Sequence, residues 1–139
     1  MRFLRSVIVR SGLAIAVAVG FAMHVSAHAA GAAIKTIDVQ QAQSMKNQGA
    51  LLLDVREPNE FEQGHAPGSI LIPLGQLKSR LQEIREHGSK PVAIICRSGR
   101  RSAQAAEILS QSGFTQISNV QGGMNAWEAA SYTIVKGSK

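Results

Sequence analysis

Cysteine is nearly absent from this sequence of 139 residues, which contains a single one, Cys96. One thiol excludes an intramolecular disulfide framework and any zinc or iron–sulfur site built from several cysteines. Acidic residues are also few, with nine Asp and Glu against 15 Lys and Arg, which gives a net charge of +6. Three of these positive charges lie within the first ten residues, and without them the excess is only +3. We therefore expect no nucleic-acid partner.

A long hydrophobic run is missing as well. The uncharged apolar run at residues 13–23 has eleven residues, about half of the roughly 20 that span a membrane. It follows a basic start and precedes Ala27-His28-Ala29, an order typical of secretory signal peptides. We expect cleavage after residue 29, or alternatively after residue 27, to remove this signal peptide. The product would be an exported protein, periplasmic or secreted, without stable membrane insertion. The alternative is an uncleaved membrane anchor.

The remaining segment, residues 30–139, is long enough for one domain. The chain is 45% hydrophobic and 17% charged, so it can bury a core. Short apolar runs alternate with stretches of helical periodicity, which predicts an α/β fold with a mostly parallel central sheet and helices on both faces. The expected strands are 51–53, 70–72, 92–96 and 117–120, and the expected helices are 39–48, 74–88, 102–113 and 124–130.

The strongest candidate for a functional site is Cys96, which ends an apolar strand. Ligands of α/β folds bind beyond the carboxyl ends of strands. Gly99 allows the following loop to turn its N–H groups inward, and Ser102 is a suitable N-cap for the next helix. Inward N–H groups and three arginines favour a thiolate, which is a nucleophile for an anionic electrophile. The candidates are Cys96 as catalytic nucleophile and Arg97, Ser98, Gly99, Arg100 and Arg101 as substrate-binding residues.

A cysteine after an apolar strand can also be an inert core residue. An inert core thiol does not need three arginines and two serines beside it in the sequence. The loop therefore favours a reactive Cys96. At least one of the arginines is expected to belong to a solvated basic face rather than to a binding site.

Four stretches of the sequence resemble single-domain rhodaneses, a family of sulfurtransferases. They are LLDVRE at 52–57 with Glu60-Phe61, GHAPGSI at 64–70 with IPL at 72–74, CRSGRRS at 96–102, and GGMNAW at 122–127. The stretches follow the family's order and span most of the segment after the signal peptide. The main departure is Ala66, where the family usually has a larger aliphatic residue, and this difference concerns local packing.

The resemblance implies a rhodanese-like fold and thiosulfate sulfurtransferase activity. Cys96 would accept the outer sulfur of thiosulfate as a persulfide and pass it to cyanide or a thiol, with no metal or organic cofactor. The matching aspartate of the family helps to hold the site together, so Asp54 is a supporting residue, and Arg56 is expected near the mouth of the pocket. Ser102 is expected to support the loop as the helix cap, and His65 belongs to a turn rather than acting as a base.

Three other functions stay open from the sequence. Phosphotyrosine-type phosphatases also combine a cysteine with an arginine, but they place one residue more between them than the four that separate Cys96 from Arg101. A non-catalytic rhodanese-like binding module is the second alternative. A relay that passes the persulfide to a protein acceptor is the third, and it needs the same site as the enzyme.

Overall fold

The computed structural model describes residues 31–138. It has an α/β fold in which five strands form one sheet in the order β1-β5-β4-β2-β3. Each neighbouring pair is parallel, which confirms the predicted parallel sheet. The strands are β1 Ile34–Ile37, β2 Leu51–Asp54, β3 Ile70–Leu71, β4 Val92–Ile95 and β5 Ile117–Val120. The expected signal peptide, residues 1–29, lies outside the described residues.

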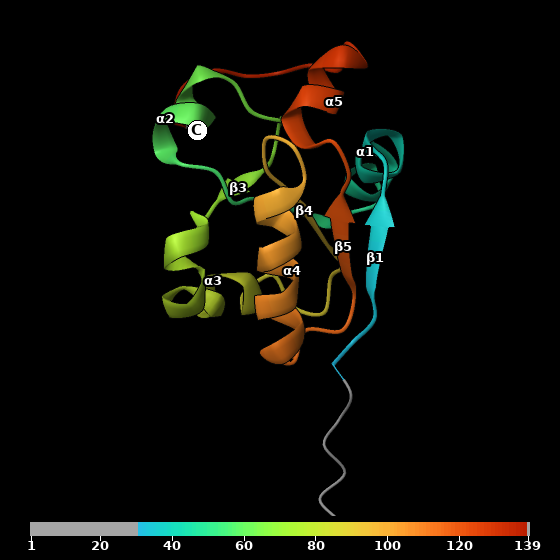
Figure 1. Cartoon of the computed structure of the whole chain (residues 1–139), viewed down its shortest axis with the longest axis vertical. Coiled ribbons are helices and arrows are strands. Elements are labelled where there is room, and N and C mark those ends of the chain that lie inside the picture. Colours follow the sequence, from blue (N-terminus) through green and yellow to red (C-terminus); the bar gives the residue numbers. More distant parts are fainter. Residues whose placement is uncertain (1–30, 139) are drawn as a thin grey trace, which may run out of the picture.

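Helices connect the strands and cover both faces of the sheet, as expected (Figure 1). They are α1 Val39–Asn47, α2 Pro58–Gln63, the 3₁₀ helix η1 Leu74–Ser79, α3 Leu81–Arg85, α4 Arg100–Gln111 and α5 Gly123–Ala129. One face packs Ile94 of β4 against Leu109 of α4, and the other packs Ile95 of β4 against Trp127 of α5. Alternate residues of a strand point to opposite faces, so β4 contributes to both halves of the core.

The expectation of one helix over residues 74–88 is wrong, because this segment divides into η1 and α3. A 3₁₀ turn contains three residues, so Leu74 and Leu77 lie on the same side of η1. Leu81 and Ile84 continue this apolar side in α3 and pack on the same part of the core. The spacing of the four residues therefore suits two short helices as well as one longer helix.

Two elements, β1 and α2, were not expected from the sequence. Strand β1 lies at an edge of the sheet and buries only Ile37, so it has no continuous apolar run. Helix α2 begins at Pro58, which suits the first helical position because its missing N–H would be unpaired there. The Glu57 N–H donates to the Glu60 carboxylate at 3.0 Å, which satisfies another donor at this helix start.

The segment after α5 crosses to α2, as Figure 1 shows. Val135 and His65 exchange two backbone hydrogen bonds of 2.9 Å, and the Gly137 N–H donates to the Glu62 carbonyl at 2.9 Å. The Trp127 indole N–H donates to the Thr133 carbonyl at 3.0 Å. These contacts tie α5 to α2 at the carboxyl edge of the sheet.

Candidate active site

The sheet provides a place for a ligand at the centre of its carboxyl edge. From β2 the chain continues to β3 on one side, whereas from β4 it continues to β5 on the other side. Strands β2 and β4 therefore flank a topological switch point, where open α/β sheets bind their ligands. Cys96 directly follows β4 and Asp54 ends β2, so both of these expected site residues lie at this switch point.

The Cys96 sulfur is surrounded by hydrogen-bond donors, although the residue is 1% exposed. The Gly99 N–H donates to Sγ at 3.1 Å, and the Ser102 hydroxyl oxygen lies 3.3 Å from it. Burial disfavours the thiolate and by itself raises the thiol pKa. The Ser102 hydroxyl and the N–H groups of Ser102, Gly99 and Ser98 outweigh burial and lower the pKa of Cys96 below its ordinary value. We call these four donors the sulfur cradle.

The loop that forms the sulfur cradle requires glycine at residue 99. Gly99 has φ +101, in the left-handed region, and a Cβ there would lie 3.4 Å from the Gly122 nitrogen. Gly99 also occupies the N-cap of α4, so the expectation that Ser102 is the cap is wrong. Because α4 begins at Arg100, Ser102 lies in its first turn, where its hydroxyl reaches the sulfur instead of the helix end.

Replacing Ser102 by alanine is expected to raise the thiol pKa of Cys96 by about one unit, because the thiolate loses a hydrogen bond. Alanine favours helix, so α4 should persist. The rate of alkylation by iodoacetamide, measured against pH, reports this pKa. The control is Ser110→Ala in the same helix, whose hydroxyl donates to the Ala32 carbonyl at 3.0 Å. Identical alkylation profiles for both variants would contradict the role of Ser102.

The three arginines of the loop have different surroundings. Arg101 forms a two-point ion pair with Glu60 of α2, with Nη1 to Oε2 at 2.7 Å and Nη2 to Oε1 at 2.8 Å. The hydrogen bonds from Arg101 lower the pKa of Glu60 to about 2, so the pair is ionised at neutral pH. The Arg101 guanidinium could therefore bind a substrate only after it releases the Glu60 carboxylate. The side chains of Arg97 and Arg100, like that of Ser98, are exposed to solvent.

Asp54 and Arg56 form a buried support next to the loop. Arg56 is 1% exposed, and its Nε and Nη2 donate to the Asp54 carboxylate at 2.7–3.0 Å. Its other donor contacts reach the carbonyls of Glu60 at 3.3 Å and Gly64 at 2.9 Å. The expected position of Arg56 at the pocket mouth is therefore wrong, because its guanidinium is enclosed between the end of β2 and α2. By holding α2, Arg56 helps to place Glu60 against Arg101.

Two groups that complete the site have no assigned role in the sequence analysis. Glu60 lies 41 residues before its partner Arg101, and nothing in the local pattern pairs them. The first turn of α5 contacts the loop through two backbone bonds. The Met124 N–H donates to the Cys96 carbonyl at 2.7 Å, and the Asn125 N–H donates to the Arg97 carbonyl at 3.0 Å. The paired glycines at the start of this helix, Gly122 as its N-cap and Gly123 as its first residue, are the signal that could have found it, since glycine permits close approach of two backbones.

Other residues that could suggest chemistry have structural surroundings. His65 is buried, its Nδ1 lies 2.8 Å from the Phe61 carbonyl oxygen, and its ring stacks on the Phe61 ring. This is the structural role expected for the turn. Within residues 31–138, no cluster of three or more His, Cys, Asp and Glu side chains could hold a metal ion. In the same part of the chain, no helix combines the length and the hydropathy needed to cross a membrane.

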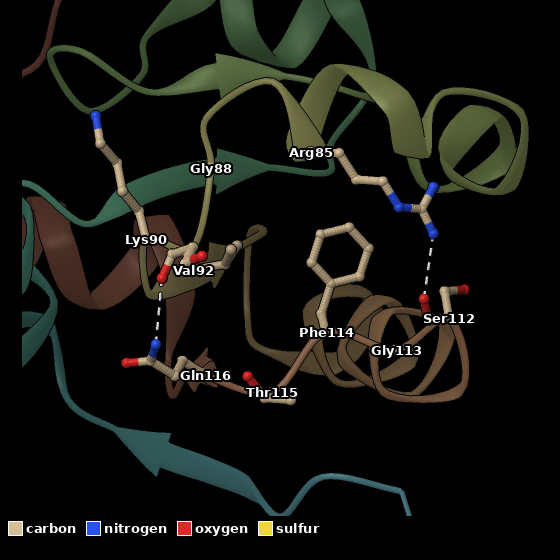
Figure 2. A pocket seen from close by; sticks show the side chains of 10 residues that line it. Arg85, Gly88, Lys90, Val92, Ser112, Gly113, Phe114, Thr115 and Gln116 are labelled. Atoms are coloured by element: carbon tan, nitrogen blue, oxygen red, sulfur yellow. Dashed lines mark hydrogen bonds between the residues drawn. The ribbon is translucent and has the colours of Figure 1, made fainter.

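Two surface hollows lie away from Cys96. One of about 240 Å³ opens at the amino end of β4, the end opposite to Cys96 (Figure 2). In its wall the Arg85 guanidinium lies over the Phe114 ring, 5.3 Å from the centroid, and donates to the Ser112 carbonyl at 3.2 Å. The second hollow is lined by residues 31–32, 110–111 and 113–115, so it shares Phe114 with the first. Neither hollow is lined by a cysteine, so the chemistry singles out the sulfur cradle as the candidate site.

The fold and the sulfur cradle define an α/β protein with a buried cysteine, surrounded by hydrogen-bond donors, at the switch point of its sheet. The sequence profile of the Rhodanese-like domain matches residues 38–130, and the chain belongs to this family. The resemblance drawn from the four sequence motifs is thereby confirmed.

Individual relatives agree with this family and with the fold. Thiosulfate sulfurtransferase GlpE of Pseudomonas syringae is 36% identical over 93 residues, which cover 67% of this chain and 86% of that protein. The YqhL protein of Bacillus subtilis is 51% identical over 78 residues, 56% of this chain but only 60% of that protein. The crystal structure of a rhodanese-related protein from Thermoplasma volcanium has a TM-score of 0.65 at 35% identity and covers 73% of this chain and 97% of that one. Together they support a rhodanese-like sulfurtransferase.

Proposed function

We propose that this protein is a thiosulfate sulfurtransferase that carries a sulfane sulfur on Cys96. The observation that carries the proposal is the sulfur cradle, with the Gly99 N–H 3.1 Å and the Ser102 hydroxyl 3.3 Å from the Cys96 sulfur. Donors that stabilise a thiolate also suit the negative terminal sulfur of a persulfide. The name of the relative GlpE supports thiosulfate as the sulfur donor.

In the first half-reaction, the Cys96 thiolate attacks the outer sulfur of thiosulfate. A new S–S bond forms at Cys96, the S–S bond of thiosulfate breaks, and sulfite leaves with the electron pair. Charge is conserved, because a persulfide anion and a sulfite dianion replace a thiolate and a thiosulfate dianion. No proton, metal or external redox partner takes part. The exposed Arg97 and Arg100 attract the dianion to the loop.

In the second half-reaction, cyanide or a thiolate attacks the terminal sulfur of the persulfide. The S–S bond to Cys96 breaks, and its electron pair returns to Cys96 as the thiolate. Both steps develop negative charge on sulfur next to the same donors, so one sulfur cradle serves both. With a protein thiol as the acceptor, the same cycle is a persulfide relay.

The intact mass of the reduced, folded protein tests the proposal. Excess thiosulfate is expected to add one sulfur, about 32 Da, as a covalent intermediate, and cyanide is expected to remove it as thiocyanate. Absence of both added mass and thiocyanate contradicts the thiosulfate activity. Release of phosphate from an aryl phosphate without sulfur uptake indicates a phosphatase, and absence of all three reactions indicates a binding module. Fast transfer to a protein thiol with slow transfer to cyanide indicates a relay.

We also propose that the protein works after export, in the periplasm or outside the cell. The support is the order of basic start, short apolar run and small residues in the sequence. Mass spectrometry of the protein from its native host is expected to find a chain that starts near Ala30. A chain that still begins at Met1 and fractionates with membranes contradicts the cleavage.

A further inference from the structure

The first turn of α5 packs directly on the backbone of the loop after Cys96. The Met124 N–H donates to the Cys96 carbonyl at 2.7 Å, and the Asn125 N–H donates to the Arg97 carbonyl at 3.0 Å. Backbone N–H groups in the first turn of a helix have no partner within the helix. Helix α5 therefore uses its free donors to hold the first two carbonyls of the loop that forms the sulfur cradle.

The planarity of the peptide bond links these outer contacts to the sulfur. In a trans peptide the carbonyl and the following N–H point in opposite directions, and the described backbone contains no cis peptide. The Arg97 carbonyl points to α5, so the N–H of the same peptide, which belongs to Ser98, points away from α5. This N–H is one of the groups that lower the thiol pKa of Cys96, and it is next in the chain to the Gly99 N–H, which donates to Sγ at 3.1 Å. Holding the carbonyl on one side thus directs the N–H on the other side.

Gly123 is the point where α5 comes close to the loop. A Cβ at this position would overlap the Cys96 carbonyl oxygen, and it would lie 2.6 Å and 2.7 Å from the carbonyl carbon and oxygen of Arg97. These are backbone atoms, which cannot rotate away as the end of a flexible side chain can. A methyl group at residue 123 therefore requires the loop and the helix to separate.

We propose that Gly123 is a positioning residue for sulfur transfer, because its bare backbone lets α5 hold the Cys96 and Arg97 carbonyls and so turn the loop N–H groups toward the reacting sulfur. The role rests on the proposed function of Cys96, but its first consequence is a property of the resting thiol. A larger residue at position 123 would displace the peptide between Arg97 and Ser98. The thiolate would then lose the Ser98 N–H, and the adjacent Gly99 N–H, which donates to Sγ at 3.1 Å, would shift with it before any substrate is present.

The charged groups around the sulfur stay unchanged when Gly123 is replaced. They are Arg97, Arg100 and Arg101 on the loop and α4, Glu60 on α2, and the buried pair Asp54 and Arg56 beside β2. The other neighbours of the sulfur are the Ser102 hydroxyl and backbone N–H groups. A change in thiol ionisation therefore reports the direction of the backbone donors and not a change in charge.

The direct test is Gly123→Ala, with Gly88→Ala as the matched control. Both glycines have a positive φ, +53 at Gly123 and +73 at Gly88, but a Cβ at Gly88 meets nothing within 4 Å. Gly88→Ala therefore adds backbone strain without the contact. In the pH dependence of alkylation, we expect the thiol pKa of Gly123→Ala to rise by about one unit, about tenfold less thiolate at neutral pH. Gly88→Ala should keep the wild-type pKa. A folded Gly123→Ala protein with the wild-type thiol pKa overturns the proposal.

A second pair of variants decides the question if Gly123→Ala does not fold. Asn125→Pro removes the N–H that the Arg97 carbonyl accepts, and proline is tolerated in the first turn of a helix. Asn125→Ala keeps this N–H and serves as the control. We expect a raised thiol pKa only in the proline variant, and equal pKa values in both overturn the proposal. Failure of the wild type to take up sulfur would reject the proposed function, whereas the thiol pKa tests the role of α5 separately.

Discussion

Replacing Cys96 by serine is expected to abolish sulfur uptake from thiosulfate and the formation of thiocyanate. Serine is nearly isosteric with cysteine, so the fold should persist, but its hydroxyl is far less acidic than a thiol and is not nucleophilic without a base. The neighbours of the sulfur are a hydroxyl and backbone N–H groups, which stabilise an anion but do not remove a proton. The sequence contains no second cysteine that could replace Cys96.

The measurement compares the intact masses of wild-type and Cys96→Ser protein after incubation with thiosulfate, and then the thiocyanate formed with cyanide. One added sulfur, about 32 Da, is expected on the wild type and none on the variant. Ser110→Ala is the control, because it changes a serine of α4 that bonds to Ala32 and not to the sulfur. Sulfur uptake by Cys96→Ser at the wild-type level would show that the sulfur binds to a group other than the Cys96 thiol, and thiocyanate formation by the variant without added mass would show that turnover needs no persulfide at Cys96.

The position of the candidate nucleophile at the end of β4 could be predicted because its signals are local. All four residues of β4 are buried, which matches their continuous apolar run, and the cysteine and Gly99 follow directly along the chain. The alternation of strands and helices is also local, and it leads to a parallel sheet whose carboxyl edge collects the loops. A strand end, a cysteine and a glycine were therefore enough to place the candidate site at this edge.

The partners of the site residues could not be predicted, because they come from distant parts of the chain. Three arginines in one loop look alike in sequence, yet Arg101 alone meets Glu60, which the unexpected helix α2 carries. The contact of Gly123 with the Cys96 and Arg97 carbonyls likewise depends on how α5 returns to the loop. Local patterns indicate which residues are available, and the packing of the elements decides which of them meet.

The largest loss of stability is expected from Asp54→Asn, about 3–5 kcal/mol in the free energy of unfolding. The substitution keeps the shape of the side chain but removes the negative charge that balances the buried Arg56 guanidinium. Two Arg56 nitrogens and the Arg56 backbone N–H all donate to this carboxylate. An arginine that stays charged inside the protein without its counter-charge is strongly destabilising, since water cannot reach it.

Glu83→Gln provides the matched control, because Arg80 and Glu83 form a similar two-point pair at the surface. The distances are 2.6 Å from Nε to Oε1 and 2.8 Å from Nη2 to Oε2, but the side chains are 33% and 47% exposed. Water and salt screen such a pair, so its loss should change stability far less than Asp54→Asn does. Urea unfolding of both variants measures the difference. Equal losses would show that burial does not set the energy of the Asp54–Arg56 pair.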